Sequence, residues 1–108
     1  IGYGRSKLSD NDYFGKVKYK LKGNKVNDFL KHCKYFSGKS YNDDESFKKF
    51  GEFIDKIEGN KYGGKSNRLV YLATPPKVFV DCCKGIKKYL SKGNGNGWTR
   101  VIIEKPFG

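Results

Sequence analysis

Arg5 is the first residue along this chain whose type and position suit a role in ligand binding. It lies in a turn with Gly4 and Ser6, directly after an apolar strand pattern at residues 1–3. Dinucleotide-binding folds that use NAD commonly carry Asp or Glu at the end of the second strand, whereas an arginine there suits the 2′-phosphate of NADP. This strand end carries Arg5 and no acid. An ordinary exposed arginine in a turn explains the residue as well, so both interpretations stay open here.

Lys105 is the second candidate, between Glu104 and Pro106 at the end of an apolar run. A proline restricts the preceding residue to extended backbone, so the Lys105 side chain leaves in a fixed direction. A lysine ammonium is a compact positive charge suited to a phosphate or a carbonyl oxygen. The context E-K-P-F-G after a strand, rather than the lysine itself, indicates a site.

Other familiar patterns are absent from the sequence. Gly2 and Gly4 are not followed by a third glycine, because position 7 is lysine, and the glycine-rich stretch 93–97 precedes a strand instead of opening a helix. Three cysteines and a single histidine lack the spacing of a zinc site. We therefore predict no metal, and no Ser/His/Asp or Cys/His catalytic set.

Residue periodicity predicts the elements that would position these candidates. Helices are expected from Ser9 or Asp10 to about Lys22, over residues 26–33, from Asp43 over residues 44–57, and over residues 75–90. Short strands are expected at residues 1–3 and 35–37. The runs RLVYLA at 68–73 and TRVIIE at 99–104 predict strands buried on both faces. Residues 59–66 and 92–97 are predicted loops.

The alternation of strands and helices predicts the fold class. It indicates an α/β, Rossmann-like parallel sheet with flanking helices and right-handed crossovers, forming one partial domain over residues 1–108. Ligands of such sheets bind outside the carboxyl ends of the strands. We expect Arg5, the turn at residues 73–75 and Lys105 at that edge.

The amino-acid composition limits which other binding partners remain possible. The 108 residues carry a formal charge of +12, which leaves a nucleic-acid-binding module as one alternative. Lysines outnumber arginines and are scattered from Lys7 to Lys105, so we favour a solvated basic surface and no nucleic acid. No apolar run reaches the roughly 20 residues of a membrane helix, so no membrane partner is expected. A chain that starts at Ile1 and contains no Met is expected to be a piece of a longer sequence.

Three segments together resemble the coenzyme domain of the glucose-6-phosphate dehydrogenase family. They are IGYGRSKL at 1–8, NRLVYLATPPKVF at 67–79 and GWTRVIIEKPFG at 97–108, where the family writes G-Y-A-R-S-x-L and G-W-x-R-I-I-x-E-K-P-F-G. GKSYNDDESF at 38–47 also aligns. The resemblance implies oxidation of glucose 6-phosphate to 6-phosphogluconolactone with hydride transfer to NADP, the first step of the oxidative pentose phosphate pathway.

The resemblance also implies roles for particular residues. Arg5 matches the arginine that binds the 2′-phosphate of NADP, and Lys105 matches the lysine that contacts both glucose 6-phosphate and the coenzyme. Phe79 matches an aromatic position near the coenzyme. Ser40 and Tyr41 match a segment near its adenine end. Five residues are thus expected at the coenzyme, and Lys105 also at the substrate.

Pro106 matches a family proline thought to adjust the site on ligand binding.

Departures from the family pattern limit what this chain can do alone. Gly4 replaces the usual alanine. The family's first strand with G-A-S-G-D-L-A would precede Ile1, and R-I-D-H-Y-L-G-K, with the catalytic histidine, would follow Gly108. We therefore expect no catalytic residue here and an inactive fragment of a cytoplasmic, homo-oligomeric enzyme.

One related alternative stays open at this point. Another Rossmann dehydrogenase family, acting on sugars or inositol, also carries E-K-P at a strand end. Its strand-end pattern reads T-P-x-x-x-H, and this chain has Thr74 and Pro75 but Phe79 where a histidine could fall.

Overall fold

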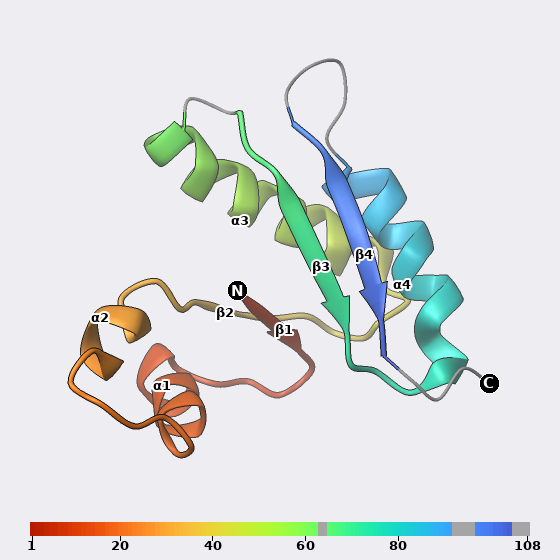
Figure 1. Cartoon of the computed structure of the whole chain (residues 1–108). Coiled ribbons are helices and arrows are strands. Elements are labelled where there is room, and N and C mark those ends of the chain that lie inside the picture. The colour runs from red at the N-terminus through yellow and green to blue at the C-terminus, as the bar shows by residue number, and fades with distance from the viewer. Residues whose placement is uncertain (63–64, 92–96, 105–108) are drawn as a thin grey trace. The chain divides into compact units, whose positions relative to one another are not determined.

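The computed structural model describes residues 1–62, 65–91 and 97–104 (Figure 1). The chain divides into two compact units, one over residues 1–40 and one over residues 41–108. Each unit contains one pair of parallel strands with helices, which confirms the α/β class predicted from the alternating pattern.

The first unit is built on the parallel pair β1 (Gly2–Gly4) and β2 (Tyr35–Ser37). The connection between the two strands contains α1 (Asp10–Lys18) and α2 (Val26–Leu30). The Tyr13 ring of α1 packs against the Tyr35 ring of β2, with centroids 5.1 Å apart. Both strands and both helices occur near their predicted positions, but α2 ends at Leu30, short of the predicted end at residue 33.

Helix α1 begins as its sequence dictates and ends early. The Ser9 side chain accepts a hydrogen bond from the Asp12 amide while the Asp12 carboxylate accepts one from the Ser9 amide, a complete capping box. The predicted end near Lys22 is wrong, because the helix stops at Lys18. Beyond it Tyr19 is 84% exposed and buries little surface that would support another turn of helix.

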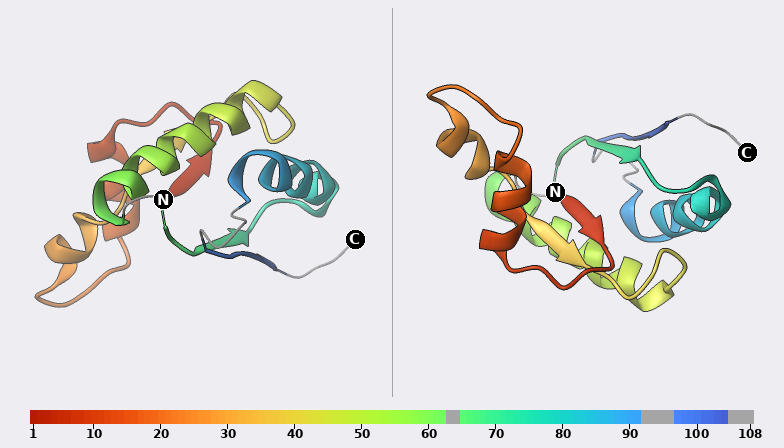
Figure 2. Two further views of the ribbon diagram at one scale, coloured as in Figure 1. Left: turned by 90° about the horizontal axis from the view of Figure 1, so that it is seen from above. Right: turned by 90° about the horizontal axis from the view of Figure 1, so that it is seen from below.

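The second unit is built on the parallel pair β3 (Arg68–Leu72) and β4 (Thr99–Ile103). Helix α3 (Asp44–Tyr62) precedes β3, and η1 (Pro76–Val78), α4 (Phe79–Gly85) and the π-helical η2 (Ile86–Leu90) connect the strands. Figures 1 and 2 show α3 and α4 on the same side of the β3–β4 pair. Between these layers lies a core of Phe47, Phe50, Ile54, Leu72, Cys82, Ile86 and Leu90.

Helix α3 is longer than the pattern predicted. Asp43 caps it as expected, its carboxylate accepting hydrogen bonds from the Ser46 amide (2.9 Å) and hydroxyl (2.5 Å). The loop predicted from residue 59 is wrong at its start, because the helix continues through Gly59 to Tyr62. One glycine in a helix costs only about 1 kcal/mol relative to alanine, which an established helix tolerates.

Two glycines allow α3 to approach the α4–η2 segment closely. A Cβ atom on Gly85 would lie 2.6 Å from the Phe47 ring, and one on Gly51 would lie 2.6 Å from the Tyr89 carbonyl oxygen. Real Cβ atoms do not approach other atoms this closely. The helix packing of the second unit therefore depends on the absence of these two side chains.

The expectation that β3 and β4 are buried on both faces is wrong for the described residues. Leu69 is 61% and Tyr71 57% exposed, and Val101, Ile102 and Ile103 are exposed too. In β3 the reason is that α3, α4 and η2 cover one face only, so alternate residues remain uncovered, whereas in β4 the successive residues 100–103 are all exposed.

The strand pairing has a simple explanation in the strand order of doubly wound folds. That order is 3-2-1-4-5-6, in which the second strand pairs with the third and the fourth with the fifth. If β1 to β4 correspond to the second to fifth strands, the two observed pairs are these neighbours. In the described residues, the single parallel sheet expected from the sequence is replaced by two separate two-stranded parallel sheets.

None of the helices described is both long enough and apolar enough to cross a membrane.

Candidate functional site

Arg5 lies where the sequence placed it, in the bend that follows β1, and it is exposed. The bend is held on both sides of this residue. Before it, the Gly38 amide donates to the Gly4 carbonyl (2.8 Å), and after it the Tyr35 hydroxyl donates to the Ser6 carbonyl (2.7 Å). A guanidinium on a fixed backbone loses less conformational entropy when it binds an anion.

Ser40 follows the neighbouring strand β2. Its carbonyl accepts a 2.6 Å hydrogen bond from the Tyr3 hydroxyl of β1. Because β1 and β2 are parallel with Gly4 opposite Ser37, the segments that carry Arg5 and Ser40 leave the same edge of the pair. The first unit thus brings two of the five predicted coenzyme residues to one strand edge.

Tyr41 and Phe79 belong to the second unit. Tyr41 is half-buried, just before α3. Phe79 is the first residue of α4 and lies beyond the carboxyl end of β3, also half-buried. At that end of β3 the Glu104 amide donates to the Leu72 carbonyl (3.3 Å), so the end of β4 lies beside it. Lys105 and Pro106, which follow, lie outside the described residues.

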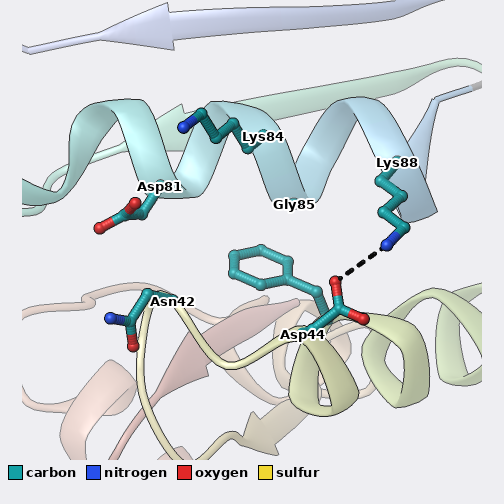
Figure 3. A pocket seen from close by; sticks show the side chains of 7 residues that line it. Asn42, Asp44, Asp81, Lys84, Gly85 and Lys88 are labelled. Carbon is teal, nitrogen blue, oxygen red and sulfur yellow. Dashed lines mark hydrogen bonds and ion pairs between the residues drawn. The ribbon is translucent and has the colours of Figure 1, made fainter.

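A cleft of about 300 Å³ opens between α3 and α4 (Figure 3). Neither charge pattern nor periodicity had pointed to it, and none of the predicted site residues lines it. Asp44 on one wall forms an ion pair with Lys88 on the other (3.4 Å) and accepts a hydrogen bond from Tyr89. The bond from Tyr89, then that from Lys88, lowers the pKa of the Asp44 carboxyl. The remaining lining residues are Asn42, Phe47, Asp81, Lys84 and Gly85.

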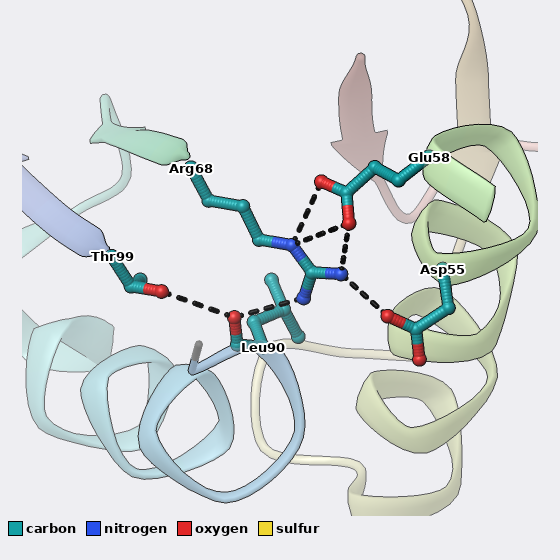
Figure 4. Close-up of polar contacts among 5 residues, drawn as sticks. All are labelled: Asp55, Glu58, Arg68, Leu90 and Thr99. Carbon is teal, nitrogen blue, oxygen red and sulfur yellow. Dashed lines mark hydrogen bonds and ion pairs between the residues drawn. The ribbon is translucent and has the colours of Figure 1, made fainter. Parts of the chain in front are cut away.

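A buried polar cluster surrounds Arg68 at the start of β3 (Figure 4). Its guanidinium donates to Glu58 (2.6–3.2 Å), to Asp55 (2.5 Å) and to the Leu90 carbonyl (2.9 Å). Desolvation acts to lower the pKa of Arg68, but the bonds to Glu58 and Asp55 outweigh it and raise the pKa. The cluster ties β3 to α3 and η2, which is a structural role.

Sequence reasoning missed this cluster, although a signal existed. Arg68 is a charged residue at the start of an otherwise apolar strand, and Asp55 and Glu58 are three residues apart on the preceding amphipathic helix. Buried charges are normally paired, so this arginine required acidic partners.

The described residues contain no group of three His, Cys, Asp or Glu side chains that could hold a metal ion. Cys33, Cys82 and Cys83 are free thiols. Burial is the main cause that raises the pKa of Cys82, which is 2% exposed, and a protonated buried thiol is a poor nucleophile.

Comparison with known proteins settles the family. Residues 1–108 match the family model described as "Glucose-6-phosphate dehydrogenase, NAD binding domain". The chain belongs to the glucose-6-phosphate dehydrogenase family. The match confirms the resemblance drawn from the strand-end motifs and decides against the sugar or inositol dehydrogenase family considered beside it.

Individual relatives agree with this assignment. The chain is 42% identical to a glucose-6-phosphate 1-dehydrogenase of Kluyveromyces lactis and 40% identical to a cytoplasmic isoform from Solanum tuberosum. It is also 42% identical to a chloroplastic enzyme of Arabidopsis thaliana. All of this chain is aligned in each case, but only 22%, 22% and 18% of the relatives' lengths. The chain therefore spans about a fifth of these enzymes.

A solved structure gives the same result. "Glucose-6-phosphate dehydrogenase in complex with its substrate glucose-6-phosphate" matches with a TM-score of 0.87 and 42% identity, over all of this chain and 23% of that one. Together with the family model, this match confirms a nicotinamide-dinucleotide-binding domain of the Rossmann type.

Proposed function

We propose that the protein containing this chain is a glucose-6-phosphate dehydrogenase that oxidises glucose 6-phosphate to 6-phosphogluconolactone. The observation that carries the proposal is the match of residues 1–108 to the coenzyme domain of this family, at about 40% identity to relatives of that name. A bound nicotinamide coenzyme would accept the hydride from the sugar C1. This chain would contribute coenzyme binding, as one partial domain over residues 1–108.

NADP is the proposed coenzyme, and Arg5 the proposed partner of its 2′-phosphate. Three features support this: Arg5 is an exposed residue, its backbone is held at Gly4 and Ser6, and the sequence directly after β1, Arg5-Ser6-Lys7, contains no acid of the kind that favours the ribose hydroxyls of NAD. A carboxylate there would repel the phosphate, whereas an arginine can donate two parallel hydrogen bonds to it.

The remaining site residues are proposed from their match to the family motifs. Ser40 and Tyr41 would lie near the adenine end and Phe79 near the coenzyme. Lys105 would contact the coenzyme and glucose 6-phosphate, and Pro106 would adjust the site. We further propose that the whole protein is cytoplasmic and homo-oligomeric, since cytoplasmic isoforms occur among the relatives, although chloroplastic ones do too.

The activity is tested on the whole purified protein with glucose 6-phosphate and NADP, by following formation of NADPH. Glucose 6-phosphate should support turnover, and free glucose or inositol should do so far less. No NADPH formation with glucose 6-phosphate, or preferential use of inositol, would contradict the proposal.

Coenzyme choice is tested by the substitution Arg5→Ala in the same protein. Loss of a hydrogen bond to a charged group costs about 1.5–3 kcal/mol, so the NADP/NAD ratio of kcat/KM should fall about 10- to 150-fold. Arg100→Ala is the matched control, because Arg100 is also exposed but stacks on Trp98, 4.3 Å from the ring centroid. An unchanged ratio in the Arg5 variant would remove Arg5 from the phosphate site.

A further inference from the structure

The Tyr35 hydroxyl occupies a space that only glycine at position 4 leaves free. A Cβ atom on Gly4 would lie 2.5 Å from the Tyr35 hydroxyl oxygen and 3.3 Å from the ring carbon that bears it. From this position the hydroxyl donates its hydrogen bond to the Ser6 carbonyl (2.7 Å). Gly4 and Ser6 are the two neighbours of Arg5, so one tyrosine contacts the bend on both sides of the arginine.

The opposite face of the strand pair shows a reciprocal arrangement. Tyr3 of β1 reaches across to the segment after β2, where its hydroxyl donates to the Ser40 carbonyl (2.6 Å). A Cβ atom on Gly38 would lie 1.9 Å from that hydroxyl oxygen. Each strand thus sends one tyrosine to a backbone carbonyl beyond the other strand, over Gly4 of β1 in one case and over Gly38, directly after β2, in the other.

The register shows that these two contacts act from different faces. Tyr35 lies opposite Gly2 and shares its face, whereas Tyr3 lies opposite Phe36 on the other face, with the rings stacked at 5.9 Å. Tyr35 is supported by the Tyr13 ring of α1 at 5.1 Å. The segment that carries Arg5 is therefore held from one face of the strand pair, and the segment that carries Ser40 is held from the other face.

We infer that Tyr35 is a positioning residue for coenzyme specificity, acting through the backbone of the Arg5 bend. The inference rests on the proposed role of Arg5 at the 2′-phosphate. Tyr35 touches neither coenzyme nor substrate in this scheme: it fixes the direction in which Arg5 leaves the strand. Gly4 is part of the same arrangement, because the side chain of an alanine at position 4 would displace the Tyr35 hydroxyl.

The test is a set of variants of the whole protein in which the dissociation constants of NADP and NAD are measured separately. Tyr35→Phe keeps the ring and removes the donor, and Gly4→Ala displaces it. Each should weaken NADP about 2- to 10-fold and leave NAD nearly unchanged, as expected for one neutral hydrogen bond. The double variant should lose no more than the single ones, because both break the same contact.

Controls separate this role from a general loss of stability. Tyr19→Phe makes the same chemical change at a residue that is 84% exposed and should alter neither constant. In an Arg5→Ala background, Tyr35→Phe should leave the NADP/NAD ratio unchanged, because the group that it positions is gone. Additive effects of Gly4→Ala and Tyr35→Phe, or equal weakening of both coenzymes, would overturn the inference.

The variants also distinguish the two proposals. If Arg5→Ala lowers the NADP/NAD ratio and Tyr35→Phe does not, positioning by Tyr35 is wrong and the role of Arg5 stands. If Arg5→Ala itself leaves the ratio unchanged, both the role of Arg5 and the positioning role of Tyr35 fall.

Discussion

Replacing Glu58 by glutamine should lower the free energy of local opening at the start of β3, because it removes the main counter-charge of the buried Arg68. The Arg68 side chain is 6% exposed and that of Glu58 10%, and three donor–acceptor contacts of 2.6–3.2 Å join them. Breaking a buried ion pair from one side costs about 3–5 kcal/mol. Asp55 and the Leu90 carbonyl would still accept from Arg68, so we expect a cost of about 3 kcal/mol.

Native-state hydrogen exchange of the whole protein measures this local opening. The Arg68 amide, which donates to the Trp98 carbonyl (2.8 Å), should exchange about 150-fold faster in Glu58→Gln. Asp55→Asn is the matched comparison on the same helix. The Asp55 side chain is 64% exposed, so solvent screens its contact and the cost should stay within about 1 kcal/mol.

The double variant Glu58→Leu with Arg68→Met completes the design. An apolar pair of similar volume leaves no buried charge, so it should be more stable than Glu58→Gln alone. Exchange accelerated less than about 5-fold in Glu58→Gln, or equally in Asp55→Asn, would refute the reasoning that burial sets the strength of this pair.

Two further outcomes follow from contacts of the second unit. Gly85→Ala should lower the thermal unfolding temperature, because its Cβ would meet the Phe47 ring at 2.6 Å. Gly59→Ala in α3 has open space and should stabilise the protein by up to about 1 kcal/mol. Unfolding temperatures that shift in the same direction in both variants would contradict this. Tyr89→Phe should raise the pKa of Asp44 in a carboxyl NMR titration, because the Tyr89 hydrogen bond is the largest cause of its lowered value. Since the folded pKa is lowered, this contact stabilises the protein at neutral pH, and that stabilisation is lost as the pH falls through the folded pKa. An unchanged titration would show that the neighbouring lysines, Lys88 and Lys48, set the pKa without Tyr89.

Local patterns predicted most elements of the fold. The Ser9 capping box, the Asp43 cap and the proline-initiated turn at Pro76 are set by nearby residues, so their elements begin where expected. Helix ends were less predictable, since they depend on tertiary contacts. Tyr19 remains 84% exposed after α1, whereas α3 runs past Gly59.

Burial could not be inferred from strand composition alone. Leu69 and Tyr71 belong to an apolar run typical of a strand covered on both faces, yet in the described residues only one face is covered. What covers a face is decided by elements elsewhere in a protein, and the relatives matched are about five times longer than this chain.

The candidate site was predictable to the extent that it depends on strand ends. Arg5 and Ser40 follow neighbouring parallel strands, so topology alone brings them to one edge. The support of that edge was not predictable, because it depends on a tyrosine hydroxyl crossing to a carbonyl 29 residues away, over a glycine of the neighbouring strand. Such long-range contacts leave no periodic signal in a sequence.

A crystal structure of the whole protein with NADP bound would test the central claim most directly. The account predicts the Arg5 guanidinium about 2.7–2.9 Å from oxygens of the 2′-phosphate, with the Tyr35 hydroxyl still donating to the Ser6 carbonyl. A 2′-phosphate held by other residues, with Arg5 turned to solvent, would contradict it.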